Sequence, residues 1–171
     1  PSLVGSEMCI RDRFPSELIH IGGDECPKVR WEKCPRCQAR IRQLGLRDKD
    51  GYTAEHYLQG YVTDRIGKYL AERGRRIIGW DEILEGQAPS DAIVMSWRGS
   101  AGGIKAAKLG HDVIMTPNSH FYFDYYQSPD ADAEPFGIGG CVTIDKVYSF
   151  DPMADLTPGQ QAHILLSLIH I

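Results

Sequence analysis

The sequence predicts an α/β fold built on a parallel sheet. Short apolar segments alternate with longer segments in which apolar residues recur every three or four positions. The first pattern is typical of strands buried on both faces, and the second is typical of helices packed against them. Strand, helix, strand is the order that produces a parallel sheet, because a right-handed crossover returns the chain in the same direction.

The predicted elements follow from local patterns. The strands are the apolar segments 18–21, 77–80, 92–96 and 112–116. The clearest helix begins after Thr53 and ends at Gly74, because these residue types are favoured at the two ends of helices. Two shorter helices are predicted at 35–44 and 101–109, each followed by a glycine. Residues 129–140 are polar and rich in small residues, which predicts a long loop.

Composition excludes several classes of protein. The chain has 171 residues, of which 42% are hydrophobic and 25% charged, with a net charge of −4. These are the proportions of a globular domain. The acidic balance argues against nucleic acid as a partner. No apolar run approaches the about 20 residues of a membrane span, so no membrane partner is expected either. The oligomeric state is left open.

The two ends of the chain differ from the rest. Residues 1–13 have no strand or helix period, and 166–171 begin an apolar run that stops. We expect residues 14–165 to form one α/β unit, and 1–13 and 166–171 to be tails that are not native coding sequence.

Carboxylates and aromatic residues follow the predicted strands at their carboxyl ends. In order along the chain these residues are Asp24 and Glu25, Trp80, Asp81 and Glu82, Trp97, and Tyr122 and Asp124. The carboxyl ends of parallel strands share one edge of the sheet, so these side chains are expected to converge there. In a β/α barrel that edge carries the chemistry.

Asp24 and Glu25 are the candidate catalytic pair. Gly22 and Gly23 precede them and allow a sharp turn and the close approach of a ligand. Neighbouring acids point in different directions, so they can act differently on one substrate. Two adjacent negative charges disfavour double ionisation, and a general acid must keep its proton. A solvated loop or a salt bridge is the structural alternative.

The candidate substrate-binding residues are mostly aromatic. Trp80 and Trp97 could stack on the apolar face of a sugar ring, with core packing as the alternative. Tyr122 and Asp124 lie on the same side of an extended chain, where a phenol and a carboxylate suit a ligand with an amide and several hydroxyls. In isolation, an aromatic-rich loop is the simpler interpretation. His20 is expected to be a core histidine of a buried strand, but its place just before the acid pair keeps it as a candidate contact. His111 is expected at the surface.

Two interpretations involve metals or cysteine chemistry. Cys34 and Cys37 have the spacing of half a zinc site, and Cys26 could add a ligand, but no second pair of this spacing exists. A structural role, or one disulfide among the three, is favoured. Asp24, Glu25, Asp81 and Glu82 could alternatively supply oxygen ligands to a divalent metal in an α/β-barrel enzyme.

Four motifs in order resemble those of one enzyme family. His20-Ile21-Gly22-Gly23-Asp24-Glu25 is similar to the signature of the β-N-acetylhexosaminidases of glycoside hydrolase family 20. The downstream motifs Gly79-Trp80-Asp81-Glu82, Ser96-Trp97-Arg98-Gly99 and Tyr122-Phe123-Asp124 extend the resemblance, which covers about residues 14–165.

The resemblance implies a (β/α)8 TIM barrel and an exo-glycosidase that removes terminal N-acetylglucosamine or N-acetylgalactosamine from the non-reducing ends of glycans. It implies retaining, substrate-assisted catalysis without a cofactor. Glu25 would be the general acid, and Asp24 would hold the substrate's acetamido group as that group attacks the anomeric carbon. Tyr122 would bind the acetamido oxygen, Trp80 and Trp97 would wall the pocket, and Asp124 would bind sugar hydroxyls.

The chain departs from the family's pattern in what it lacks. The barrel strands before the acid pair, with their sugar-binding arginine, are not present, and the approach to the last strand ends in 166–171. The resemblance therefore implies a partial barrel, roughly strands 4 to 7. We expect the isolated chain to be unstable and nearly inactive, because a partial barrel exposes two sheet edges. A non-catalytic sugar-binding relative is a second alternative. A periplasmic or extracellular location is favoured by the resemblance alone.

Overall fold

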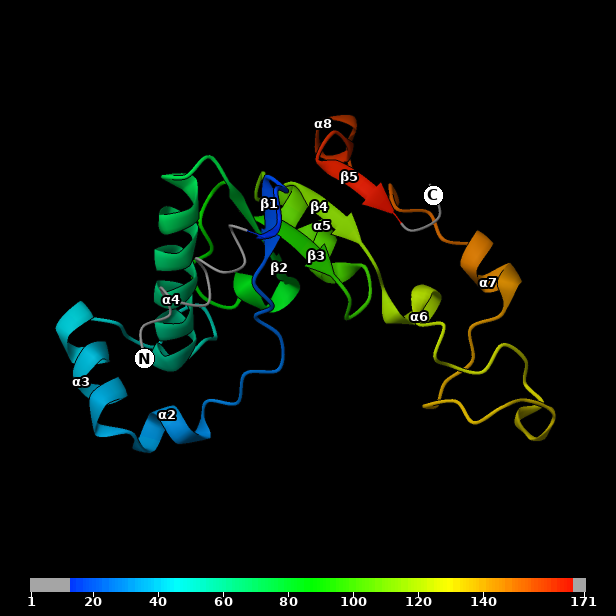
Figure 1. Cartoon of the computed structure of the whole chain (residues 1–171), viewed down its shortest axis with the longest axis horizontal. Helices are drawn as coiled ribbons and strands as arrows, with labels where there is room; N and C mark the ends of the chain where they lie inside the picture. Colours follow the sequence, from blue (N-terminus) through cyan, green and yellow to red (C-terminus); the bar gives the residue numbers. More distant parts are fainter. Residues whose placement is uncertain (1–12, 168–171) are drawn as a thin grey trace.

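The computed structural model describes residues 13–167 and contains one five-stranded parallel sheet. Its strands are β1 Leu18–His20, β2 Arg76–Trp80, β3 Ile93–Ser96, β4 Val113–Met115 and β5 Ile164–Ser167. They lie side by side in chain order (Figure 1). Every crossover therefore moves one position in the same direction, as in a β/α barrel, whereas a doubly wound sheet reverses its order. The predicted α/β class with a parallel sheet is confirmed.

The helices connect the strands and include all three predicted ones. They are α2 Val29–Lys33, α3 Pro35–Leu44, α4 Ala54–Ala71, η1 Asp81–Leu84, α5 Ala101–Lys108, α6 Asn118–Phe121, η2 Ala131–Ala133, α7 Ile144–Tyr148 and α8 Pro158–Gln161. Helix α4 ends at Ala71, before the predicted Gly74. Helices α6, α7 and α8 were not predicted, because an element of about one turn is too short to show an apolar period.

The core lies between the sheet and helices α4 and α5. Leu70 of α4 and Ala106 of α5 pack with Ile77, Val94 and Val113 from the three central strands. Side chains alternate between the two faces of a strand, so these strand residues all point to the helical layer. Along β2, the alternate residues Ile78 and Trp80 are only half-buried. The helical layer thus covers one face of the sheet, and the other face remains more open.

The first strand corrects one prediction. Residues 18–21 were predicted to be a strand buried on both faces, but β1 has a neighbour on one side only and its burial alternates between exposed and intermediate. Leu18 is 36% exposed. His20 is exposed as well, so it is not the core histidine that a buried strand would require. The physical reason is the position of β1 at the edge of the described sheet.

His111 is also placed differently from the prediction. It was expected at the surface, but it is buried, and its Nδ1 lies 3.1 Å from the carbonyl oxygen of Ala92. This contact satisfies the polar ring atom within the protein.

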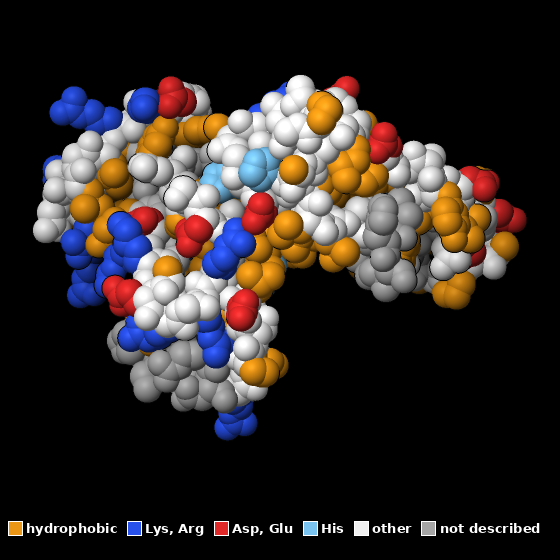
Figure 2. All heavy atoms as spheres, turned by 90° about the horizontal axis from the view of Figure 1, so that it is seen from above, with side chains coloured by type: hydrophobic (Ala, Val, Ile, Leu, Met, Phe, Trp, Pro, Cys, Tyr) orange, Lys and Arg blue, Asp and Glu red, His pale blue; other side chains and the backbone are white. Residues whose placement is uncertain are grey.

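The segment from α6 to α7 extends away from the sheet (Figure 1). It carries exposed apolar side chains, among them Phe136 at 91% exposure, together with Ile138 and Tyr148. Figure 2 shows apolar side chains in orange over this projecting part as well as over the body of the molecule. Between residues 13 and 167, no helix combines the length and the apolar character needed to cross a bilayer.

Strand β5 extends beyond the predicted boundary at residue 165. Leu166 and Ser167 pair with Ile114 and Met115 of β4. The described segment thus contains one strand more than the four of the sequence-based estimate. Most of the predicted tails, 1–13 and 166–171, lies outside the described residues, so their origin stays a prediction.

Candidate active site

The backbone after β1 turns sharply to present the acid pair. Gly22 and Gly23 adopt positive φ values of 72° and 104°, and Glu25 follows at 43°. A Cβ atom on Gly23 would lie 2.8 Å from Cγ2 of Ile83, so both the backbone conformation and the packing require glycine. The turn leaves Asp24 and Glu25 exposed at the carboxyl end of β1.

Trp97 and Tyr122 form a stacked pair contributed by two neighbouring strands. Their ring centroids are 6.2 Å apart and their planes differ by 13°. Burial raises the pKa of Tyr122, and the nearby Tyr125, Asp124, Asp24 and Glu25 raise it further. The phenol therefore stays protonated and can donate a hydrogen bond. The charges of Asp24 and Glu25, which follow β1, thus act on a phenol that follows β4.

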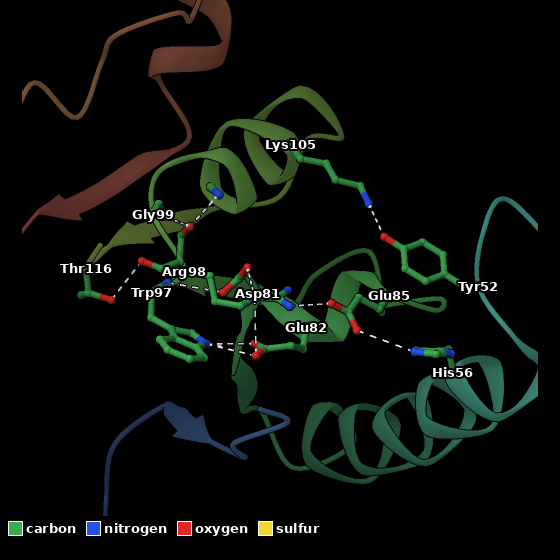
Figure 3. Close-up of polar contacts among 12 residues, drawn as sticks. Tyr52, His56, Asp81, Glu82, Glu85, Trp97, Arg98, Gly99, Lys105 and Thr116 are labelled. Atoms are coloured by element: carbon green, nitrogen blue, oxygen red, sulfur yellow. Dashed lines mark hydrogen bonds and ion pairs between the residues drawn. The ribbon is translucent and has the colours of Figure 1, made fainter. Parts of the chain in front are cut away.

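The carboxylate of Glu82 accepts a hydrogen bond from the indole of Trp97. The indole Nε1–H donates to Oε2 at 3.0 Å and to Oε1 at 3.2 Å (Figure 3). Glu82 is only 7% exposed. Because a buried carboxylate needs partners, this contact orients the indole and satisfies the acid at once.

Arg98 joins three carboxylates beside this indole. Its Nε lies 3.0 Å from Oδ2 of Asp81 and 3.5 Å from Oε1 of Glu82, and its Nη1 lies 2.7 Å from Oε1 of Glu85. Partial burial by itself would lower the pKa of Arg98, but the hydrogen bond to Glu85 and the charge of Asp81 outweigh it and raise that pKa. Glu85 also lies 3.9 Å from Nε2 of His56 on α4 (Figure 3). The network thereby ties the loop after β3 to η1 and to α4.

His20 and Trp80 form a separate aromatic contact. The two rings meet edge to face with centroids 4.9 Å apart, and Nδ1 of His20 accepts the backbone N–H of Gly22 at 3.1 Å. Desolvation lowers the pKa of His20, and the charge of Asp24 acts in the opposite direction. His20 therefore supports the turn that carries the acid pair.

A cavity of about 500 Å³ opens beside these residues. Its lining includes Glu25, Glu82, Trp97, Arg98, Lys28 and His56. Among the described residues, Asp24, Trp80, Tyr122 and Asp124 lie outside this lining. Glu25 and Trp97 thus line one cavity, and Tyr122 stacks on Trp97. The predicted pocket residues Trp80 and His20 contact each other outside this cavity. Asp124 is exposed next to Tyr122.

Two of the four acids proposed as divalent-metal ligands form ion pairs or hydrogen bonds with protein side chains. Arg98 contacts Asp81 and Glu82, and Trp97 donates its indole N–H to Glu82. Within residues 13–167 no three His, Cys, Asp or Glu side chains form a group that could hold a metal ion. Cys26, Cys34 and Cys37, the candidates for zinc or for a disulfide, are free thiols.

The contacts of Arg98 with Asp81 and Glu82 were not predicted from the sequence. Arg98 was assigned no role, and Asp81 and Glu82 were considered only as metal ligands. A signal was available, because Asp81 and Glu82 follow one strand, Arg98 follows the next, and the carboxyl ends of neighbouring parallel strands lie side by side. Opposite charges at those two positions are expected to pair.

Comparisons with known proteins agree with this architecture. The family model for the catalytic domain of glycosyl hydrolase family 20 matches residues 7–166. The beta-hexosaminidase of Porphyromonas gingivalis is 48% identical over 154 residues, which are 90% of this chain and 19% of that protein. The human beta-hexosaminidase subunit beta is 30% identical over 146 residues, 77% of this chain and 24% of that protein.

Solved structures resemble the chain in the same way. An inactive variant of the exo-β-N-acetylglucosaminidase of Vibrio harveyi superposes with a TM-score of 0.75 at 27% identity, over 92% of this chain and 24% of that one. The β-N-acetylhexosaminidase of Bacteroides fragilis gives a TM-score of 0.69 at 28% identity, over 96% of this chain and 32% of that one.

Fold and site together define a segment of a glycoside hydrolase β/α barrel, with acids and aromatic residues at the carboxyl ends of its strands. The sequence matches then narrow this class, and the chain belongs to glycosyl hydrolase family 20. The predicted family and the partial TIM barrel are confirmed. The chain spans about a fifth of the P. gingivalis relative.

Proposed function

We propose that this chain supplies the acid pair and part of the sugar pocket of an exo-acting β-N-acetylhexosaminidase. The observation that carries the proposal is the cavity that Glu25 and Trp97 line together, with the ring of Tyr122 stacked on Trp97. A proton donor, a second carboxylate, a phenol and an indole at one sheet edge are the groups that cleavage of an acetamido sugar requires.

Each group has a distinct task in the proposed reaction. Glu25 protonates the departing glycosidic oxygen and later takes a proton from the attacking water. The substrate's own acetamido oxygen attacks the anomeric carbon, and its fixed position gives it a high effective concentration. Asp24 holds the acetamido N–H, and Tyr122 donates its O–H to the acetamido oxygen. The intermediate is an oxazolinium ion, so the stereochemistry at the anomeric carbon is retained.

The remaining residues shape the binding site. Trp97 offers an apolar face to the sugar, and Glu82 fixes the plane of that face. Asp124 binds sugar hydroxyls. Trp80 and His20 pack against each other outside the cavity that Glu25 and Trp97 line, and we assign them to contacts with the sugar in the complete barrel.

The test uses an exchange chimera, in which residues 14–165 replace the aligned segment of the P. gingivalis relative. We expect the chimera to cleave aryl N-acetyl-β-glucosaminides. Glu25→Gln should slow substrates with poor leaving groups far more than those with good ones, because only the former need the proton. Asp24→Asn should lower turnover of acetamido substrates.

Two results would count against the assignment. Equal losses for good and poor leaving groups in Glu25→Gln would remove the general-acid role of Glu25. Unchanged turnover in Asp24→Asn would remove the acetamido-binding role of Asp24. Asp132→Asn, at an exposed carboxylate on the projecting segment, serves as the matched control and should leave both kinds of substrate unaffected.

A further inference from the structure

Cys34 and Cys37 lie on the same first turn of α3, away from the proposed sugar pocket. Cys34 is the N-cap residue, with an extended backbone (φ −84°, ψ 116°), and Cys37 is three residues further along the helix. Both residues are half-buried, and both thiols are free. Residues three apart at the start of a helix face the same side.

The two thiols are in contact and are chemically unequal. Cys34 Sγ accepts hydrogen bonds from the backbone N–H and the thiol of Cys37 and from the backbone N–H of Arg36, and these contacts lower the pKa of Cys34. Burial and the neighbouring Cys34 raise the pKa of Cys37, with a smaller contribution from Glu55. The first sulfur is thus suited to attack as a thiolate, and the second to follow it.

The neighbouring contacts hold this turn in place. Nε2 of Gln38 donates to Oε1 of Glu55 on α4 at 2.8 Å and to the carbonyl oxygen of Trp31 at 3.1 Å. The backbone N–H of Cys34 donates to the same Trp31 carbonyl at 3.2 Å. The pair therefore sits on a fixed helix end, where the two sulfurs stay close without large backbone movement.

We propose that Cys34 and Cys37 form a reversible dithiol–disulfide pair that exchanges with low-molecular-weight disulfides such as glutathione disulfide. The Cys34 thiolate attacks one sulfur of the small disulfide, a mixed disulfide forms, and the first small thiol leaves. The Cys37 sulfur then attacks Cys34 Sγ and the second small thiol leaves. The two cysteines lose two electrons and two protons, and the small disulfide gains them as two thiols.

The other described cysteines provide internal controls. Cys26 and Cys141 are also half-buried free thiols, but neither shares a helical turn with a second cysteine. If general exposure governed reactivity, all four thiols would react at similar rates. If the position on the first turn of α3 governs reactivity, Cys34 should react faster than Cys26 and Cys141.

The experiment uses the full 171-residue chain and, as a second arm, the exchange chimera. Each is equilibrated with reduced and oxidised glutathione, quenched in acid, alkylated and digested with trypsin. Trypsin cuts after Arg36, so Cys34 and Cys37 fall on separate peptides and a disulfide between them gives a distinct linked mass. We expect that linked peptide, and in the reduced protein we expect several-fold faster alkylation of Cys34 than of Cys26 or Cys141.

Single variants separate the steps. Cys37→Ser should accumulate the glutathione adduct on Cys34, because the resolving sulfur is missing. Cys34→Ser should give neither the adduct at this site nor the linked peptide, and Cys26→Ser should behave as the wild type. The proposal is wrong if the linked peptide is absent at oxidising ratios, if Cys34 reacts no faster than Cys141, or if unfolding in urea leaves its selectivity unchanged.

Discussion

The carboxylate of Glu82 accepts the indole N–H of Trp97 at 3.0 Å, and the same indole stacks on Tyr122. The buried carboxylate of Glu82 on η1 therefore fixes the orientation of an indole that follows β3, the next strand along the sheet. Nε of Arg98 lies 3.5 Å from Oε1 of Glu82, so this buried acid also has a charged partner.

Removing this carboxylate should loosen the indole. We expect Glu82→Ala in the exchange chimera to lower the free energy of unfolding by about 1–3 kcal/mol, because a partly buried donor loses its acceptor. Glu82→Gln keeps an acceptor oxygen and should cost less. Urea unfolding measures the free energy of unfolding. The fluorescence of Trp97 is obtained by subtracting the spectrum of the same protein carrying Trp97→Phe, and it reports the environment of the indole. An unchanged fluorescence in Glu82→Ala would contradict the positioning role.

The turn before the acid pair should tolerate no side chain at Gly23. We expect Gly23→Ala to destabilise the chimera by about 1–3 kcal/mol, because the residue combines a positive φ with a close approach to Ile83. Activity should fall more steeply than stability, since the turn presents Asp24 and Glu25. Gly159→Ala is the control, because a Cβ there meets nothing within 4 Å. Equal losses of stability in Gly23→Ala and Gly159→Ala would contradict the role assigned to the positive φ of Gly23 and to its approach to Ile83.

An ion pair across the sheet should make folding sensitive to acid. Nη2 of Arg76 on β2 lies 2.8 Å from Oδ2 of Asp112, next to β4, and this hydrogen bond lowers the pKa of Asp112, with a further contribution from His163. A carboxyl with a depressed folded pKa stabilises the fold above its unfolded pKa of about 3.9. That stabilisation is lost as the pH falls through the folded value.

The measurement is the urea midpoint of the chimera as a function of pH. We expect the wild type to lose stability below about pH 4, and Asp112→Asn to remove part of this slope. At neutral pH the substitution should lower the free energy of unfolding by about 1 kcal/mol or less, because the Arg76 side chain is 42% exposed and solvent screens the pair. Asp132→Asn is the matched exposed control, and identical slopes for the two variants would rule out the Asp112 contribution.

The isolated chain should behave differently from the chimera. Strand β1 has a free edge in the described sheet, one sheet face is half-buried, and Phe136 and Ile138 are exposed. Such edges and apolar surfaces pair with other chains. We expect the 171-residue chain to aggregate in size-exclusion chromatography and to show almost no glycosidase activity. A monomer that melts cooperatively and cleaves an aryl N-acetylglucosaminide would overturn this prediction.

Local sequence patterns predicted four of the five strands, the three longest helices, and the candidate acids and aromatic residues. Buried strands such as 92–96 and long amphipathic segments such as 54–71 carry strong local periodicity, and Gly45 and Gly110 mark helix ends. The carboxyl ends of parallel strands must share one edge, so Asp24, Trp80, Trp97 and Tyr122 could be assigned to a common rim.

Which of these residues contact one another could not be predicted from local patterns. Side-chain partners depend on the distance between strands and on rotamers, which no local pattern records. The pairing of Trp97 with Glu82, the three carboxylates around Arg98 and the contact of His20 with Trp80 all join separate strands or loops. Burial is decided in the same way, since exposed His20 and buried His111 owe their environments to neighbouring elements rather than to their own segments.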